Sequence, residues 1–127
     1  MELFAKLDME FVTLNQYIDK ERGHRMAGAA VKKQQTLMAV SGMPKNKKIP
    51  TPCKLYFHWR VKTMAGDLDN LSFCKKFVID GMVLIGAIPD DSKKHINEFR
   101  DTFEVNKKVG VDIFFEKNEK KLLTIDK

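Results

Sequence analysis

The chain has 127 residues, 43% of them hydrophobic, which suits one domain with a single core and is too short for two ordinary domains. Its formal net charge of +6 is typical of proteins that meet a polyanion. No apolar run approaches the ~20 residues of a membrane span, and the first residues lack a cationic region followed by an apolar stretch, so we expect a cytoplasmic protein. Cys53 and Cys74 form no CxxC pair and the histidines are scattered, which excludes a zinc finger and predicts two reduced, buried cysteines.

The first half of the chain predicts a strand, a helix and a basic loop. From Leu3 to Phe11, apolar residues alternate with more polar neighbours, which is the period of a half-buried strand. Residues 25–40 predict an amphipathic helix that ends at Gly42. Its expected core side consists of Met26, Ala27, Ala30, Val31, Leu37, Met38 and Val40. Residues 42–52 combine three prolines with three lysines and no regular period, which predicts a mobile basic loop.

The second half begins with the clearest strand of the chain, residues 54–62. One of its faces suits the core, with Leu55, Phe57, Trp59 and Val61, and the other is cationic, with Lys54, Tyr56, His58, Arg60 and Lys62. A helix and two strands are expected next, at about residues 70–85, 95–105 and 109–117, and then a polar tail, residues 118–127, that need not be ordered. The sequence thus predicts one α+β domain over residues 1–127, in two layers, with a mixed sheet, two main helices and the order β-α-β-α-β-β.

Two tight clusters of acidic residues indicate a metal site. Asp67 and Asp69 flank one residue, Asp90 and Asp91 are adjacent, and none of them belongs to a longer acidic run. Carboxylate oxygens are the ligands that Mg²⁺ prefers, and such sites keep positions open for phosphate and water. An EF-hand loop is excluded, because Leu71 stands where that loop requires an oxygen ligand. Helix capping and turn formation are the alternative roles, but each needs one carboxylate per helix end, and this segment offers two.

Helix geometry favours a site in which the two clusters meet across a dimer over one formed within a single chain. A helix over residues 70–85 would be ~24 Å long, whereas residues 86–90 reach back only ~17 Å when fully extended. Asp91 is therefore not expected to join Asp67 and Asp69 of its own chain. Two copies of the helix, packed antiparallel about a two-fold axis, would build composite sites in a homodimer.

The same helix offers an apolar seam for that dimer. Its expected core side comprises Leu71, Phe73, Cys74, Phe77, Val78, Leu84 and Ile85. Ile79 and Val83 lie on the polar side, where a monomer would expose them to water, and they are candidates for the dimer interface. Isolated apolar residues on a surface are equally ordinary.

The acidic segment resembles a known family. D-L-D-N at residues 67–70, a lysine, D-G four residues after it and I-P-D-D-S at residues 88–92 together resemble the signature of the RusA family of Holliday-junction resolvases, which is common in bacteriophages and prophages. The resemblance implies a crossover junction endodeoxyribonuclease in which Asp67, Asp69 and Asp91 bind Mg²⁺ and Lys76 assists catalysis.

Other residues of the segment have supporting roles in this interpretation. Asn70 and Asp80 match family positions, and Asp80 and Asp90 would orient the metal-binding groups. The gap between Asn70 and Lys76 is three residues longer than in the shortest family members, so Lys75 remains a substitute candidate for the catalytic lysine.

The expected chemistry is hydrolysis of a phosphodiester, with no organic cofactor. Mg²⁺, or Mn²⁺ in its place, would bind the scissile phosphate and lower the pKa of a coordinated water, and Lys76 would neutralise a phosphate oxygen or the leaving group. The predicted DNA-binding residues are Lys20, Arg22, His24, Arg25, Lys32, Lys33, Lys45, Lys47, Lys48, Arg60 and Lys62. His58 and His95 are interpreted as structural rather than as general bases.

Two other functions remain open at this point. One is a nuclease that cuts flaps, forks or ordinary duplex, and the other is a DNA-binding protein whose acidic site is vestigial. A two-fold pair of sites favours four-way junctions, because their resolution needs two symmetric cuts. The sequence therefore predicts a homodimeric junction endonuclease that acts on branched DNA, encoded by a phage or prophage and working in the bacterial cytoplasm.

Overall fold

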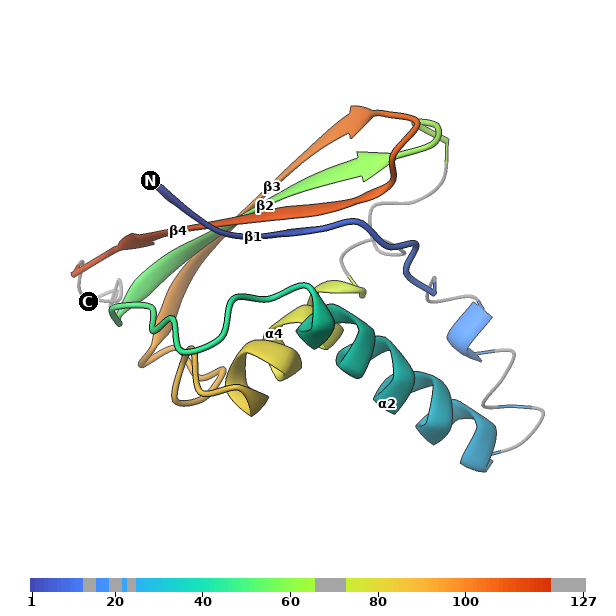
Figure 1. Ribbon diagram of the computed structural model, residues 1–127, viewed down its shortest axis with the longest axis horizontal. Helices are drawn as coiled ribbons and strands as arrows, with labels where there is room; N and C mark the ends of the chain where they lie inside the picture. The colour runs from blue at the N-terminus through green and yellow to red at the C-terminus, as the bar shows by residue number, and fades with distance from the viewer. Residues whose placement is uncertain (13–15, 19–21, 23–24, 66–72, 120–127) are drawn as a thin grey trace, which may run out of the picture.

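Figure 1 shows the computed structural model, which describes residues 1–12, 16–18, 22, 25–65 and 73–119. The chain forms a single α+β domain in which helices cover one side of a four-stranded mixed sheet, as the sequence predicts. The elements are β1 (Glu2–Leu7), α2 (Arg25–Ser41), β2 (Cys53–Val61), α4 (Lys75–Leu84), β3 (Ile96–Val105) and β4 (Gly110–Lys117). None of the helices in the described ranges is long and apolar enough to cross a membrane.

The sheet has the strand order β1-β4-β2-β3. β2 and β3 run parallel, and α4 connects them, because parallel neighbours need a crossover that returns the chain to the end where it started. β4 runs antiparallel to both β1 and β2 and lies between them. β1 and β3 are therefore the two edge strands of the sheet.

β2 forms the centre of the core, as its alternation predicts. Leu55 and Phe57 are fully buried and Trp59 is 1% exposed, so these side chains face the helix layer. Cys53 and Cys74 are buried and form no disulfide, as the sequence predicts. Burial raises the pKa of the Cys53 thiol to about 11 and that of Cys74 to about 12, so both thiols stay protonated near neutral pH.

α4 begins later than the sequence predicts. Its first residue is Lys75, and residues 73–74 form a turn in which the Lys76 N–H donates to the Phe73 carbonyl at 3.2 Å. Residues 70–72, also expected in the helix, lie outside the described residues. The ten residues of α4 span ~15 Å, so the expected distance of ~24 Å between the helix ends is too long.

The end of α4 is the predicted one. Gly86 has a φ of 76°, which glycine adopts without steric cost. Its N–H donates to the Val83 carbonyl at 3.0 Å, and the Ala87 N–H donates to the Met82 carbonyl at 2.9 Å. These are the two hydrogen bonds of a Schellman motif, which turns the chain away from the helix before Asp90 and Asp91.

α4 is covered on two sides, by the sheet and by α2. Its contact with α2 includes Gly81, where an added Cβ would lie only 3.0 Å from Val40 Cγ2. Ile79 is 7% exposed and Val83 packs against the core, whereas Leu84 is 62% exposed. The predictions that Ile79 and Val83 would lie in water and that Leu84 would lie in the core are wrong. The hydrophobic period of α4 cannot show that α2 packs against its second side.

The buried side of α2 matches the predicted one only in part, because Val40 packs against the core but other predicted residues do not. Gln35 and Ala39 are buried, whereas Leu37 and Met38 are 49% and 40% exposed. Gln35 is accommodated inside because its Oε1 accepts the backbone N–H of Val12 at 2.9 Å. A polar side chain with a partner thus takes a core position, and two large apolar side chains remain on the outside.

The basic loop, residues 42–52, is anchored to the domain. Ile49 is 4% exposed, and its N–H donates to the Ala87 carbonyl at 2.9 Å. Lys47 Nζ donates to the Leu3 carbonyl at 2.9 Å, on the outer edge of β1. The loop that the sequence predicts to be mobile is therefore held at two separate points.

Candidate metal and nucleic-acid site

The structure describes one half of the acidic segment. Asp67, Asp69 and Asn70 lie outside the described residues, whereas α4 and the turn that carries Asp90 and Asp91 are described. Within the described ranges, no group of three or more histidine, cysteine, aspartate or glutamate side chains could hold a metal ion. A metal centre that includes Asp91 would need ligands from outside these ranges or from a second copy of the chain.

Asp90 and Asp91 have different environments. Asp90 Oδ1 accepts the Ser92 N–H at 2.8 Å, and Asp90 Oδ2 lies 3.7 Å from His95 Nε2. The hydrogen bonds from Ser92, with smaller contributions from His95 and Lys94, hold the pKa of Asp90 below its usual value. Asp91 is exposed and makes no hydrogen bond or ion pair with another described residue. Asp90 therefore holds the turn, and Asp91 has carboxylate oxygens available for a cation.

The turn between α4 and β3 is fixed to the start of β2. The His95 carbonyl accepts the Cys53 N–H at 2.8 Å, and His95 Nδ1 lies 3.1 Å from Thr51 Oγ1. Ala87 and Ile88 are buried at its other end. Asp91 thus lies on a turn that is anchored at both ends, and the contacts of His95 support a structural role.

Lys75 is held in a partly buried cluster. Its Nζ lies 2.7 Å from Asp101 Oδ2 and 4.5 Å from the centre of the Phe99 ring. Asp101 Oδ1 accepts the Trp59 Nε1–H at 2.9 Å, so one carboxylate binds both groups. The Lys75 side chain is 11% exposed. Lys75 fixes the start of α4 to β3 and is not available to a ligand in this arrangement.

Lys76 is the exposed lysine of the two. Its side chain is 53% exposed, and its Nζ lies 3.6 Å from Asp80 Oδ1, one turn further along α4. An exposed pair of this kind contributes only a few tenths of a kcal/mol and is easily broken. Of the two candidate lysines, Lys76 is the one that can reach an external phosphate.

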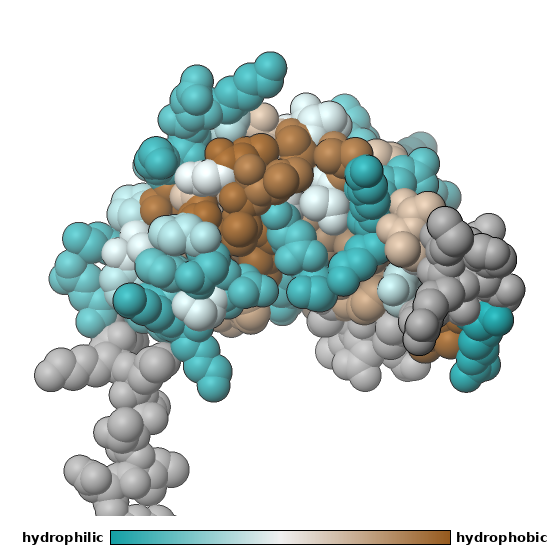
Figure 2. Space-filling view, turned by 90° about the horizontal axis from the view of Figure 1, so that it is seen from below, coloured by the Kyte–Doolittle hydropathy of each residue, from teal (hydrophilic) through white to brown (hydrophobic). Residues whose placement is uncertain are grey.

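A shallow groove lies between the outer faces of α2 and α4. Its floor is mainly apolar, and the residues that line it are Ala29, Lys32, Lys33, Thr36, Leu37, Asp80 and Leu84. Figure 2 views the molecule from the helix side and shows an apolar patch surrounded by hydrophilic side chains. The groove thus combines exposed apolar surface with charges of both signs.

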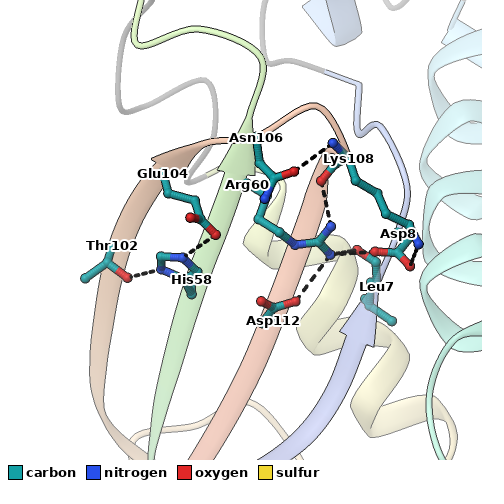
Figure 3. Close-up of polar contacts among 9 residues, drawn as sticks. All are labelled: Leu7, Asp8, His58, Arg60, Thr102, Glu104, Asn106, Lys108 and Asp112. Carbon is teal, nitrogen blue, oxygen red and sulfur yellow. Dashed lines mark hydrogen bonds and ion pairs between the residues drawn. The ribbon is translucent and has the colours of Figure 1, made fainter.

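Arg60 corrects a prediction. The sequence places it on the DNA-binding surface, but its side chain is only 3% exposed. Figure 3 shows its guanidinium donating to the Leu7 carbonyl at 2.9 Å and the Lys108 carbonyl at 2.6 Å. Its Nη2 also lies 2.8 Å from Asp8 Oδ1 and 3.2 Å from Asp112 Oδ1. Arg60 ties three strands together and cannot also bind a phosphate.

Gly110 explains why Arg60 can be buried. It lies opposite Arg60 in the sheet, and a Cβ added to it would collide with the Leu7 carbonyl oxygen and lie 2.7 Å from Arg60 Nη2. The missing side chain leaves space between β1 and β4, which the guanidinium fills. The alternation of β2 does not predict this, because the space is created by a residue on another strand.

His58 is also engaged on both ring nitrogens. Nδ1 lies 2.7 Å from Thr102 Oγ1, and Nε2 lies 3.0 Å from Glu104 Oε1 (Figure 3). All three side chains lie on the sheet face opposite the helices, because His58 pairs with Thr102 across β2 and β3. This arrangement supports a structural role for the histidine.

The remaining predicted DNA contacts differ in how free their charges are. Exposed lysines that make no ion pair with another described residue are Lys32, Lys33, Lys45 and Lys48. Lys47 lies 2.9 Å from Glu2, and Lys62 lies 3.3 Å from Glu10. Arg22 is exposed, whereas the side chain of Arg25 and the residues Lys20 and His24 lie outside the described part.

Two cations near Asp91 are missing from the prediction. Lys93 and Lys94 follow Asp91 on the same turn, are exposed, and make no ion pair with another described residue. Their position next to the acidic pair in the sequence was the available signal. They place positive charge beside the free carboxylate, where a phosphate bound to a metal ion would need it.

Comparisons with known proteins give no match to a protein family, a curated protein or a solved structure. The likeness to the RusA family therefore remains a resemblance of the motif. Support for a function comes from the residues and their geometry.

Proposed function

We propose that this protein is a Mg²⁺-dependent endodeoxyribonuclease that resolves four-way DNA junctions in recombination and repair. The observation that carries the proposal is the division of roles between Asp90 and Asp91. One carboxylate holds the turn, and the other is free on a rigid support. A turn that is only structural needs the first carboxylate and not the second.

The proposed chemistry assigns a role to each described residue. Asp91, with Asp67 and Asp69, would hold Mg²⁺ or Mn²⁺, because carboxylates suit hard cations. The bound ion would supply Lewis acidity and a water of lowered pKa. Lys76 carries the exposed ammonium that neutralises a phosphate oxygen or the leaving group. Lys75, held by Asp101, keeps the start of α4 in place.

A site shared between two copies fits the placement of the described residues. Ala65, the last described residue before Asp67, follows the C-terminal end of β2. The turn that carries Asp91 lies at the opposite end, where the Cys53 N–H binds the His95 carbonyl. The nine residues of β2 separate these ends by ~26 Å. This separation supports a homodimer in which one copy contributes Asp91 to the centre of the other.

We place the second copy on the groove between α2 and α4. Leu37 and Leu84 expose apolar surface there, although both lie on well-formed helices. Lys32, Lys33 and Asp80 supply both signs of charge around it. A patch with both signs can face a second copy of itself, because a two-fold axis can bring the lysines of one copy opposite the aspartate of the other.

Single substitutions in the acidic pair test the proposal. We expect Asp91→Asn to reduce Mg²⁺-dependent cleavage of a four-way junction by more than about 100-fold. Loss of a residue that only orients a metal ligand costs up to about 100-fold in activity, and loss of the ligand itself should cost more. Asp90→Asn is the matched control. Its amide oxygen can still accept the Ser92 N–H, so most activity should remain. Wild-type cleavage by Asp91→Asn would contradict the metal role.

The choice of DNA substrate separates the junction proposal from its alternatives. A four-way junction, a fork and a duplex of the same sequence should be compared with and without Mg²⁺. Preferential, metal-dependent cutting of the junction at two symmetric positions is expected. Equal cutting of the duplex would indicate a general nuclease, and tight binding without cutting would indicate a DNA-binding protein.

Mixed dimers test whether the site is shared. We expect Asp67→Asn and Asp91→Asn subunits each to be inactive alone and to recover nicking of junctions when they are mixed, because one centre of each heterodimer then keeps all its carboxylates. Refolding the two together, with each variant refolded alone as the control, ensures exchange of subunits. No recovery in heterodimers isolated with two different tags would show that each site belongs to one chain.

A further inference from the structure

The open face of the sheet, opposite the helices, carries an aromatic pair on its two inner strands (Figure 1). Tyr56 of β2 and Phe114 of β4 are direct partners in the register. Their ring centres lie 6.1 Å apart and their planes meet at 84°, so the edge of one ring meets the face of the other. In this geometry each ring keeps at least one face that the other does not use. Both side chains are only partly buried, although they stand in the middle of the sheet.

The aromatic pair belongs to a row that crosses all four strands. Leu3 of β1 is the register partner of Phe114, and Arg100 of β3 is the partner of Tyr56. Because directly paired residues share a face of the sheet, these four side chains stand side by side. Leu3 is 46% exposed, and Arg100 is exposed as well. This aromatic row thus offers apolar and aromatic surface that ends in a guanidinium group.

The charges without an ion pair beside the aromatic row are positive. Lys6 stands in the adjacent row, and neither Lys6 nor Arg100 makes an ion pair with another described residue. The nearest acidic side chains are bound by basic partners, in the pairs Glu98 with Lys54, Glu104 with His58 and Asp112 with Arg60. Glu116 is exposed further along β4 and limits the positive area at that end. The area around the aromatic row therefore suits a polyanion.

We propose that the aromatic row binds an unpaired segment of DNA, with bases stacked on Tyr56 and Phe114 and phosphates at Lys6 and Arg100. Every base has a flat π-face, so stacking on aromatic side chains needs no particular sequence, and cations alongside bind the backbone. Adjacent strands lie ~4.8 Å apart, which places Lys6 and Arg100 on strands ~14 Å apart. The two rings between them provide places for about two bases. Only the choice of DNA over RNA rests on the proposed function.

Variants that remove a ring but keep its bulk test the stacking. Binding of a labelled thymidine oligonucleotide of about ten nucleotides should be measured by fluorescence anisotropy in EDTA, without divalent metal. We expect Tyr56→Leu and Phe114→Leu each to weaken binding at least about fivefold, because each removes one stacking face. Phe114→Tyr keeps the ring and should bind like the wild type. Phe99→Leu removes a ring from the opposite face of the sheet and should also leave binding unchanged.

The salt dependence of the same binding tests the two cations. Lys6→Ala and Arg100→Ala should each make the log–log slope of the binding constant against salt shallower by about 0.7, the contribution of one phosphate contact on a single strand. Lys54→Ala is the matched control on this face, because Glu98 already holds its charge, and it should leave the slope unchanged.

The outcomes are separate from those of the nuclease proposal, because the measurement contains no metal ion and no cleavage step. Wild-type affinity in both leucine variants, or no binding by the wild type at low salt, would overturn the stacking site. An equal loss of binding to a duplex of the same length would show damage to the fold and count against it too. Tighter binding of a uridine oligonucleotide made of RNA would contradict the assignment to DNA. Selective loss of single-stranded DNA binding in the leucine variants supports the proposal.

Discussion

At the scale of the residue, Asp8 links the charge state of the protein to the packing of Arg60. Burial alone would raise the pKa of Asp8, but hydrogen bonds from Lys108 and Arg60 outweigh it and leave the pKa below its usual value. A carboxyl group whose pKa is lowered by folding stabilises the fold above its unfolded pKa of ~3.9. That contribution is lost as the pH falls through the folded value.

A pH series on Asp8→Asn follows from this linkage. At neutral pH the variant should have a lower free energy of unfolding than the wild type, and the difference should vanish as the pH falls below ~4. Urea denaturation at both pH values measures it. Glu10→Gln is the control, because its partner Lys62 is exposed and the pair should contribute little. A difference that persists unchanged in acid would show that the charge of Asp8 is not its source.

Adjacent residues of the same type also have different roles in the structure. Asp90 and Lys75 hold the framework, while Asp91 and Lys76 are left exposed. The sequence predicts both pairs, and its preference for Asp91 and Lys76 agrees with their exposure. For the lysines the reason is absent from the local pattern, because it depends on Asp101 of β3. For the aspartates it is local, because the Ser92 N–H binds Asp90.

At the scale of the element, the sequence predicts the order of strands and helices, and the core face of β2, because these depend on local alternation and on glycine stops such as Gly86. The buried sides of α2 and α4 depend on contacts between distant segments. The hydrogen bond from Val12 to Gln35 and the close approach at Gly81 decide them. Neither leaves a signal in the period of a single helix.

The exposed leucine of α4 gives a prediction about assembly. Leu84→Glu should weaken dimerisation at least about 30-fold, or about 2 kcal/mol, because it places a charge at the centre of the proposed interface. The stability of the monomer should change little, since Leu84 is 62% exposed. Sedimentation equilibrium measures the effect, and Met64→Glu, at an exposed methionine outside the groove, is the control. A monomeric wild type would contradict the shared site.

At the scale of the whole molecule, the cations differ in whether an acidic side chain holds them. On the open face, Lys54 lies 3.4 Å from Glu98, His58 lies 3.0 Å from Glu104, and Arg60 binds Asp112. Exposed cations without an ion pair among the described residues are Lys6 and Arg100 on the open face, and lysines of the basic loop and of the turn after Asp91 elsewhere. The basic loop lies against the turn that carries Asp91, because the Ile49 N–H binds the Ala87 carbonyl, and we therefore expect a polyanion to bind beside this turn.

The salt dependence of DNA binding tests this orientation. Lys45→Ala combined with Lys48→Ala should make the log–log slope of the binding constant against salt shallower by about 2, since each phosphate contact contributes nearly one unit. Lys54→Ala, on the open face, is the control and should leave the slope unchanged. Fluorescence anisotropy of a labelled junction in Ca²⁺ measures binding without cleavage. Equal slopes in all three proteins would remove the loop from the footprint.

The shared carboxylate of Asp101 makes Trp59 an internal reporter. Trp59 is the single tryptophan of the chain, and its indole N–H and the Lys75 ammonium bind the same carboxylate. Any ligand that pulls on the first turn of α4 must disturb this bridge and with it the polarity around the indole. The emission of the unlabelled protein can thus follow events next to Lys76 with no added dye.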